Sequence, residues 1–567
     1  ATSHETRPLR SPAELMQPER LGALQATELS FSRSLMRKMI RERWQIEPVH
    51  FAIDERARGD ALYRIDTGTA RFHFIVFSFE PVYDELRTPR IIGRRWDMFG
   101  ALVEGEATPE IIEHTRQEWA KLYAGRATPQ TLVWCRSNRS SRAFDHTVER
   151  LAAGRQPDLA TVAEVGYLMR NTGLDGNGTF GTKSYLAYEP DHPLRTPYHA
   201  QMLCAFLMRE FAADLVEHLA RCRSPRAARL DPALRRYLGL GNGSALGLGF
   251  WVINHPHWVH HWLELRERAL AHAQAQEATP NSPEVTRFLT LLDRTITYRE
   301  QDRIKDYGGF AESKLVAAEL RQVRPLIEEY QRQGTIAGQP TNHPWATLCA
   351  RLPAGLCAET EETVHALVSD VYPAFADAVE AAHRVPEVFE LEPAMPAGEL
   401  LELLRREWSW AYAFDMSAPG ARYYTWYKSE EAEEPRRGPR HEVEGGYELG
   451  IDFPGEVQRL TRLLEDYDPT RPVGEFLLDH PDTYAFIERV QSLRGLLYST
   501  PHMNMFDEHF IPAYLTRLVC VPFFGLTKTR ARLNRALTGL IHEGAPTAAD
   551  IAAGWDGEWW HPAEPEL

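Results

Sequence analysis

The sequence lacks the segments that mark several large classes of protein. It has no run of about 18 apolar residues that could span a bilayer, and its start, ATSHETRPLR, has no apolar core of a signal peptide. The 6 cysteines are scattered without a CxxC pair, so zinc and dithiol redox motifs are not indicated. A formal net charge of −15 argues against a nucleic-acid-binding surface. We therefore expect a soluble, cytoplasmic protein with no nucleic-acid and no membrane partner.

Familiar catalytic signatures are missing as well. The sequence contains neither a GxSxG nucleophile elbow nor the set of kinase motifs. The glycine-rich stretch LGLGNGSALGLGF at 238–250 has no GxGxxG and no GK[ST], and a helix-like segment precedes it where a dinucleotide fold needs a strand. A serine hydrolase, a protein kinase and a nucleotide fold at this stretch therefore have no support.

Apolar periodicity predicts a mixed beginning and a helical remainder. Residues 20–44 have helical spacing, whereas 49–53 and 61–79 are rich in aromatic and β-branched residues, as strands are. Thr67-Gly68-Thr69 breaks the second segment, which predicts a hairpin, and 96–103 supplies a third strand. Helical patterns dominate from 109 onward without βαβ alternation. The predicted fold class is α+β, predominantly α-helical, with a small N-terminal antiparallel sheet and a large helical body.

The length predicts more than one domain. A chain of 567 residues exceeds the size of about 250–300 residues at which a single core stops growing. We expect an N-terminal α+β domain over 1–125, a helical core with glycine-rich turns over 126–340 and a C-terminal helical region over 341–567. The segment 429–446 mixes acidic and basic runs with Gly and Pro, which is typical of a solvated loop or a lid.

Two Gly-Asn-Gly motifs, at 176–178 and 241–243, are the best indicators of a site. We interpret both as turns, because Asn-Gly is a common turn pair and glycine lets backbone N–H groups approach a ligand. Asn177 and Asn242 are the central residues of the two motifs, Asp175 precedes the first motif and Ser244 follows the second. The functional hypothesis is a set of backbone donors for a carboxylate or a phosphate. The alternative is that these glycines allow close packing and a sharp turn.

Basic residues near these motifs extend the hypothesis. Arg136, Arg139 and Arg142 recur at every third residue beside serines, which on a helical turn or loop makes a donor-rich surface. Arg170 and Lys183 flank the first motif. In an acidic chain, such a cluster predicts the docking of an anionic substrate. Ion pairs with nearby acidic residues are the alternative.

A histidine cluster follows the second motif. His255 precedes a proline, as expected at the start of a helix. On that helix His257, His261 and Glu264 share one stripe, which suits a divalent metal but also fits plain solvent exposure. We favour a metal-free role in which His255 or His257 is a general base, because a helix N-terminus lowers the pKa of a histidine.

Together these features predict a cytosolic enzyme that acts on a small carboxylate- or phosphate-bearing metabolite by lyase-like acid–base chemistry. The catalytic candidates are His255, His257 and Asp175. Either no cofactor or a divalent metal is expected. A haem or non-haem iron oxidoreductase and a non-catalytic helical interaction protein are the rival classes. Two questions stay open: whether the chain forms a homo-oligomer, and whether His502 and His509 meet the histidine cluster.

Overall fold

The structure is a computed structural model of the chain. It describes residues 8–81, 96–118, 130–176, 185–245, 256–304, 310–382, 389–415, 451–498, 512–526, 536–555 and 557–567, together with the short pieces 307, 417, 425–427, 436–437 and 530–532. Within these ranges, every helix is too short or too polar to cross a membrane.

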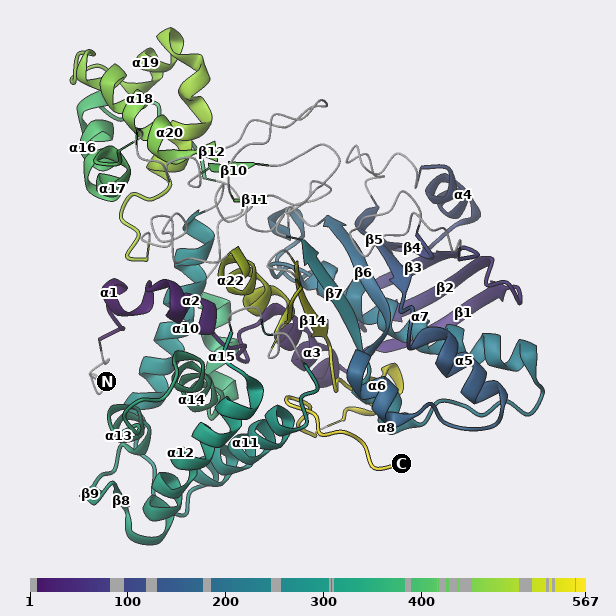
Figure 1. Cartoon of the computed structure of the whole chain (residues 1–567). Helices are drawn as coiled ribbons and strands as arrows, with labels where there is room; N and C mark the ends of the chain where they lie inside the picture. Colours follow the sequence, from purple (N-terminus) through teal and green to yellow (C-terminus); the bar gives the residue numbers. More distant parts are fainter. Residues whose placement is uncertain are drawn as a thin grey trace.

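A large mixed sheet occupies the right-hand half of the molecule as drawn in Figure 1. In the described part of the chain, nine strands pair in the spatial order β1 (Gln45–Ile53), β2 (Gly59–Asp66), β3 (Arg71–Ser78), β4 (Met98–Glu104), β5 (Thr131–Arg139), β6 (Tyr167–Gly176), β7 (Gly239–Ala245), β14 (Ala536–Ile541) and β13 (Arg530–Arg532). Neighbouring strands are antiparallel except β6 and β7, which run parallel. The sheet curls into half a barrel.

The first strands form where the sequence predicts them. β2 buries Ala61, Tyr63 and Ile65 at alternate positions, which is the period of a strand with one covered face. At the predicted break, Gly68 has a φ of +83° and the Thr67 N–H donates to the Ala70 carbonyl at 3.0 Å. β4 then pairs with β3. The expected hairpin and its third strand are confirmed.

The expected fold class, predominantly helical with a small N-terminal antiparallel sheet, is wrong. Five further strands, β5, β6, β7, β14 and β13, extend the sheet through segments that we expected to be loops or helices. β6 and β7 escaped the prediction because glycine stands in them where β-branched and aromatic residues usually reveal a strand. The single sheet also takes strands from 1–125, 126–340 and 341–567, so it crosses both expected domain boundaries.

Helices cover the two faces of this sheet. α7 (His199–Arg223) lies along one face and contacts β4, β5, β6 and β7. On the opposite face, α4 (Pro109–Glu118) packs Ile111 and Ile112 against a cluster that contains Phe77 and Phe99. The other helices near the sheet are α3 (Phe31–Glu42), α5 (Phe144–Ala152), α6 (Leu159–Val165), α8 (Pro232–Tyr237), α22 (Pro512–Phe524) and α23 (Ala548–Ala553).

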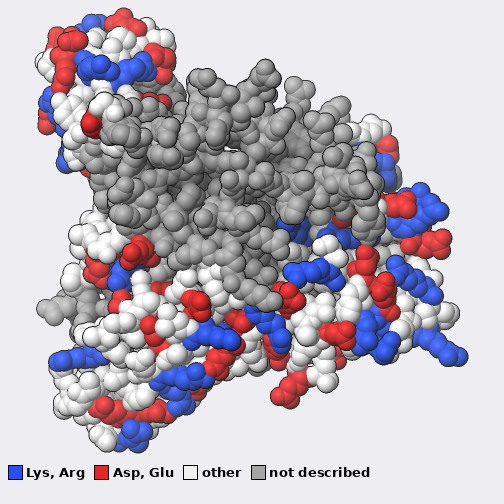
Figure 2. Space-filling model, in the orientation of Figure 1, with Lys and Arg blue, Asp and Glu red and all other residues white. Residues whose placement is uncertain are grey.

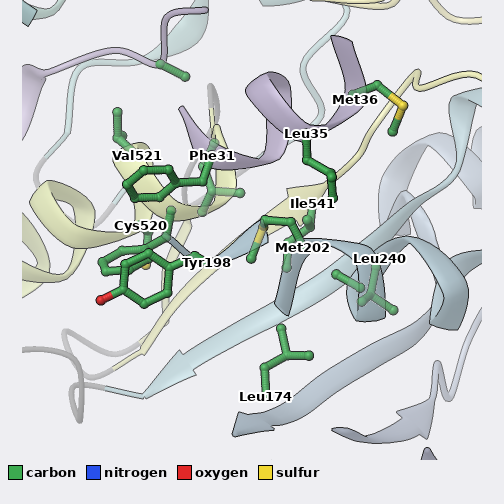
Figure 3. Close-up of a cluster of buried hydrophobic side chains, with 14 of the residues drawn as sticks. Phe31, Leu35, Met36, Leu174, Tyr198, Met202, Leu240, Cys520, Val521 and Ile541 are labelled. Carbon is green, nitrogen blue, oxygen red and sulfur yellow. The ribbon is translucent and has the colours of Figure 1, made fainter. Parts of the chain in front are cut away.

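Figure 3 shows the core between the sheet and the helices. Leu174, Leu240 and Ile541 come from three neighbouring strands and lie in one buried cluster with Met202 of α7 and Leu35 of α3. Side chains alternate along a strand, so the residues on either side of Leu240 face away from this core. The core thereby decides which residues of β7 can line a site on the other face.

Two helical groups complete the molecule (Figure 1). The lower group comprises α1 (Pro12–Leu15), α2 (Pro18–Ala23), α10 (Pro256–Ala275), α11 (Pro283–Glu300), α12 (Ser313–Gln333), α13 (Pro344–Ala350), α14 (Ala358–Asp370) and α15 (Pro373–Ala382). The group at the upper left comprises α16 (Ala397–Glu407), α17 (Ser409–Tyr412), α18 (Phe453–Glu465), α19 (Val473–Asp479) and α20 (Tyr484–Gln491). Trp408, Leu460 and Phe476 are buried at the centre of this second group.

A buried ionic cluster, the paired cluster, joins the N-terminal segment to α10 and α14. It consists of Arg10, Arg20, Arg266, Glu267 and Glu362. Arg10 binds Glu267 at 2.7 Å and Glu362 at 2.6 Å, while Arg266 binds the same carboxylates at 3.0 and 2.6 Å. Burial alone would raise the pKa of Glu362, but Arg10 and Arg266 hold it well below its usual range. Arg20 binds Glu362 at 2.9 Å and Glu361 at 2.7 Å, so every arginine of this cluster has a carboxylate partner.

Candidate functional site

Both Gly-Asn-Gly motifs contribute to strands at the centre of the sheet. Gly176 is the last residue of β6, and the remainder of the first motif lies outside the described residues. Residues 241–243 lie inside β7, between β6 and β14. The second motif is therefore part of a strand and not the turn that we expected.

The glycines of β7 are explained by close packing. A Cβ on Gly241 would lie 2.8 Å from ring atoms of Tyr167, and a Cβ on Gly239 would lie 2.9 Å from the carbonyl oxygen of Ile541. Both distances are shorter than ordinary van der Waals contacts. Glycine is needed here so that the Tyr167 ring can lie over Gly241 and the chain at the end of β14 can pass close to Gly239.

A β-bulge places Tyr167 and Arg170 on this same glycine face. Tyr167 pairs with Gly239 and Arg170 pairs with Gly241. Two residues of β6 therefore lie between these pairs, opposite a single residue of β7. In a regular strand, residues three apart point to opposite faces. The extra residue in β6 cancels that alternation and brings both side chains to the face that carries the two glycines.

A cavity of about 60 Å³ lies where β6 and β14 meet α6 and the ends of α8 and α11. We call it the arginine–tyrosine cavity. Three arginines, three tyrosines and two carboxylates line it: Arg142, Arg170, Arg303, Tyr167, Tyr237, Tyr298, Asp302 and Glu543. The fold thus brings together two of the predicted substrate-binding residues. Arg142 comes from the connection after β5, and Arg170 comes from β6.

The three arginines of the cavity differ in their pairing. Arg142 binds Glu164 at 2.7 Å, and Arg303 binds Glu564 at 2.9 Å. Arg170 is half-buried, and among the described residues it has no hydrogen-bond or ion-pair partner for its guanidinium group. Arg170 is therefore the cation of the cavity whose charge is not yet neutralised.

The tyrosines supply neutral donors beside Arg170. The Tyr298 hydroxyl donates to the carboxylate of Glu543. Burial, together with the negative charges of Glu543 and Glu564, raises the pKa of Tyr237. Tyr237 consequently keeps its proton at neutral pH and can donate a hydrogen bond to a ligand oxygen.

Other predicted binding residues lie elsewhere. The guanidinium of Arg136 stacks over Trp96 at 4.9 Å and that of Arg139 over Phe144 at 4.5 Å, so neither lines the cavity. Asn242 is buried on the Leu240 face of β7, opposite to the glycines. Asp175 and Ser244 are described by their strand positions only, and His255, Asn177, Lys183, His502 and His509 lie outside the described residues.

The histidine cluster has a different arrangement from the predicted stripe. His257 is buried in α10, whereas the potential ligand atoms that lie within 4.8 Å of one another belong to His260, His261 and Glu264. The Tyr498 N–H donates to Nδ1 of His260 at 3.0 Å, so the ring proton of neutral His260 is on Nε2, which lies 3.5 Å from the Glu264 carboxylate. A metal-bound histidine usually donates a proton from its other nitrogen. His260 therefore lies between a backbone donor and the Glu264 carboxylate, and a metal on the predicted set His257, His261 and Glu264 stays a prediction.

Comparison with known proteins adds no assignment. No protein-family model, no curated protein and no solved structure matches the chain. The case for a function therefore depends on the geometry of the cavity.

Sequence reasoning missed Tyr167, Tyr237, Tyr298 and Glu543. Tyr167 had a local signal, because it stands three residues before Arg170. The other three come from α8, α11 and the residues after β14, and no spacing in the sequence links these segments. The fold alone brings them to one cavity.

Proposed function

We propose that the chain is an enzyme that binds a small anionic metabolite in the arginine–tyrosine cavity and acts on it by acid–base chemistry. The observation that carries this proposal is the half-buried Arg170, which has no counter-ion within the described part of the chain. A buried charge without a partner is unfavourable. A carboxylate or phosphate that enters the cavity would neutralise the charge of Arg170. It would also accept two parallel hydrogen bonds from the guanidinium group.

The acid–base roles in this proposal fall to a tyrosine and a carboxylate. Tyr237 keeps its proton and would stabilise negative charge on the ligand by hydrogen bonding. Glu543 lines the same cavity and accepts a hydrogen bond from the Tyr298 hydroxyl, so it is the candidate base. The sequence had indicated His255 or His257 for proton transfer, but no histidine is among the described residues that line the cavity.

The size of the cavity limits the ligand. One water-sized position needs roughly 10–15 Å³, so a cavity of about 60 Å³ offers about four to six such positions. A ligand of a few heavy atoms fits this volume, whereas a nucleotide or a peptide does not. The proposal is therefore restricted to small metabolites.

A cytoplasmic location and the lack of a nucleic-acid partner belong to the same proposal. All six cysteines are free, as is usual in a reducing compartment. In Figure 2, Lys and Arg side chains alternate with Asp and Glu over the described part of the face shown. A nucleic-acid-binding protein would be expected to carry a continuous basic surface.

Calorimetric titration with acetate and with phosphate tests the binding step. We expect the wild-type protein to bind at least one of these anions and Arg170→Gln to weaken that binding by at least about tenfold. Arg405→Gln is the matched control, because Arg405 is an exposed, ion-paired arginine in α16, remote from the cavity. The proposal fails if the wild-type protein binds neither these anions nor an amino acid.

The enzymatic step needs a second measurement. Proton NMR of a mixture of small carboxylates, amino acids and phosphate esters should show one compound consumed by the wild-type protein and spared by Arg170→Gln. Tyr237→Phe should slow that reaction by about 10² or more, which is typical of a lost proton-transfer or hydrogen-bonding group. A ligand that binds without any chemical change would identify a binding protein instead of an enzyme.

A further inference from the structure

The arginine–tyrosine cavity carries charge of both signs. Arg142 and Arg303 are neutralised by their own partners, so Arg170 is the one lining arginine whose charge is unpaired in the described structure. Two carboxylates, Asp302 and Glu543, line the same space. A dianion such as phosphate would meet one available cation and two negative groups, which is poor electrostatic complementarity.

The opposite charges begin close together on the glycine face. The Cα atom of Glu543 lies 3.2 Å from the position of a Cβ on Gly239, and Arg170 pairs with Gly241, two residues further along β7. With about 3.3 Å per residue and about 4.8 Å between strands, the Cα atoms of Gly239 and Arg170 are about 8 Å apart. Arg170 and Glu543 nevertheless form no ion pair with each other.

The surroundings of Glu543 also favour a cation. Its negative charge contributes to the raised pKa of Tyr237, behind the larger effect of burial and ahead of the opposing charge of Arg303. The Tyr237 and Tyr298 rings add π-faces that attract ammonium groups. One end of the cavity therefore suits an anionic group and the other end suits a cationic group.

We infer that the ligand is a small zwitterion, an α-amino acid with a short side chain, whose carboxylate binds Arg170 and whose ammonium group binds Glu543. This inference rests on the proposed function and narrows its substrate class. An α-amino acid carries both charges on groups attached to one carbon, which matches two oppositely charged side chains that start beside Gly239 and beside Gly241. The cavity of about 60 Å³ limits the ligand to the size of glycine or alanine.

Calorimetric titration with glycine, alanine, acetate, methylammonium and phosphate tests the inference. We expect the wild-type protein to bind glycine at least about tenfold more tightly than acetate. Glu543→Gln should weaken glycine binding by at least about tenfold and leave acetate binding unchanged or stronger, whereas Arg170→Gln should weaken both. Glu465→Gln removes one negative charge in α18, remote from the cavity, and should bind glycine as the wild type does.

The possible failures are distinguishable. If acetate or phosphate binds as tightly as glycine, and Glu543→Gln leaves glycine affinity unchanged, the zwitterion is excluded while the proposed anion site stands. If none of the probes binds to the wild-type protein, the proposed function fails together with the inference. Should Glu543→Gln not fold, Glu543→Asp keeps the charge but withdraws it from the ligand. It should then lower the preference for glycine over acetate, and an unchanged preference overturns the inference.

Discussion

The paired cluster and the arginine–tyrosine cavity are both rich in arginine, but their charges are used differently. In the paired cluster, Arg10 and Arg266 bind two carboxylates, Glu267 and Glu362, whose side chains are 1% and 0% exposed. In the cavity, Arg170 faces open volume and has no counter-ion within the described part of the chain. The number of charged residues therefore does not identify a binding site. A charge that the fold leaves without a counter-ion does identify one.

The largest loss of folding stability is expected from a substitution in the paired cluster. Glu362→Gln leaves Arg10 and Arg266 with too few counter-charges and should lower the free energy of unfolding by about 3–5 kcal/mol, measured by urea denaturation. Glu361→Gln is the matched control on the same helix. Its carboxylate is 29% exposed and pairs with Arg20, so the loss should be below about 1 kcal/mol. Equal losses in the two variants would contradict the distinction between buried and exposed pairs.

A smaller loss of stability is expected at Gly241, which lies under the Tyr167 ring that lines the cavity. Gly241→Ala forces a methyl group against the Tyr167 ring and should lower the free energy of unfolding by about 1–3 kcal/mol. The displaced ring should also weaken ligand binding. The same change in a Tyr167→Leu background should cost less, because the smaller side chain can yield, and a double-mutant cycle measures this coupling. Additive losses would show that Tyr167 is not what excludes a Cβ here.

Arg170→Gln should separate binding from stability. Ligand affinity should fall by at least about tenfold, equivalent to about 1.4 kcal/mol. The free energy of unfolding should stay within about 0.5 kcal/mol of the wild-type value or rise, because a half-buried charge without a partner is removed. If Arg170→Gln destabilises the protein as Glu362→Gln does, Arg170 is a structural residue and the contrast between the two clusters disappears.

The smallest effect is expected at an intermediate pair, Arg236 and Asp550, which lie 2.8 Å apart. Burial would raise the pKa of Asp550, but hydrogen bonds from Arg236 and Thr547 lower it to about 2, against an ordinary value of 3.8. The ionised carboxylate therefore stabilises the fold above about pH 4, and this stabilisation is lost as the pH falls through about 2. The shift corresponds to about 2.4 kcal/mol, which solvent screening reduces to about 1 kcal/mol.

Urea denaturation of Asp550→Asn and of the wild type at several pH values checks this expectation. The variant should be less stable by about 1 kcal/mol at neutral pH and equal to the wild type near pH 2. A difference that grows as the pH falls would mean that the assigned direction of the pKa shift is wrong.

The sequence predicted the strands that have ordinary strand composition and missed the others. β2 and β3 are aromatic and β-branched around a Thr-Gly-Thr turn, so their hairpin was visible. β7 was not, because glycine alternates with Leu238 and Leu240 where larger residues usually stand. This alternation of glycine and leucine has the two-residue period of a strand, and it was the signal from which β7 could have been predicted. Pairing across hundreds of residues, as between β7 and β14, has no local signature.

The candidate site was predicted in part. Arg142 and Arg170 were recognised as cations in an acidic chain, and the fold brings both to one cavity. Arg139 was chosen on the same ground and stacks on Phe144 instead. Residue type could not separate these cases, because each arginine's role depends on partners such as Glu164, which only the fold supplies. Whether His255 contributes stays a prediction, since it lies outside the described residues.

The bulge between Tyr167 and Arg170 makes the cation site independent of a one-residue change in the length of β6. Deleting Leu168 or Met169 would leave Tyr167 and Arg170 two residues apart in a regular strand, so both side chains would stay on the glycine face. Conversely, a single codon inserted between them in an ancestral, regular strand would have been absorbed as the bulge. Arg170 and the residues after it would have kept their register with β7, with the neighbouring strands and their hydrogen bonds largely retained.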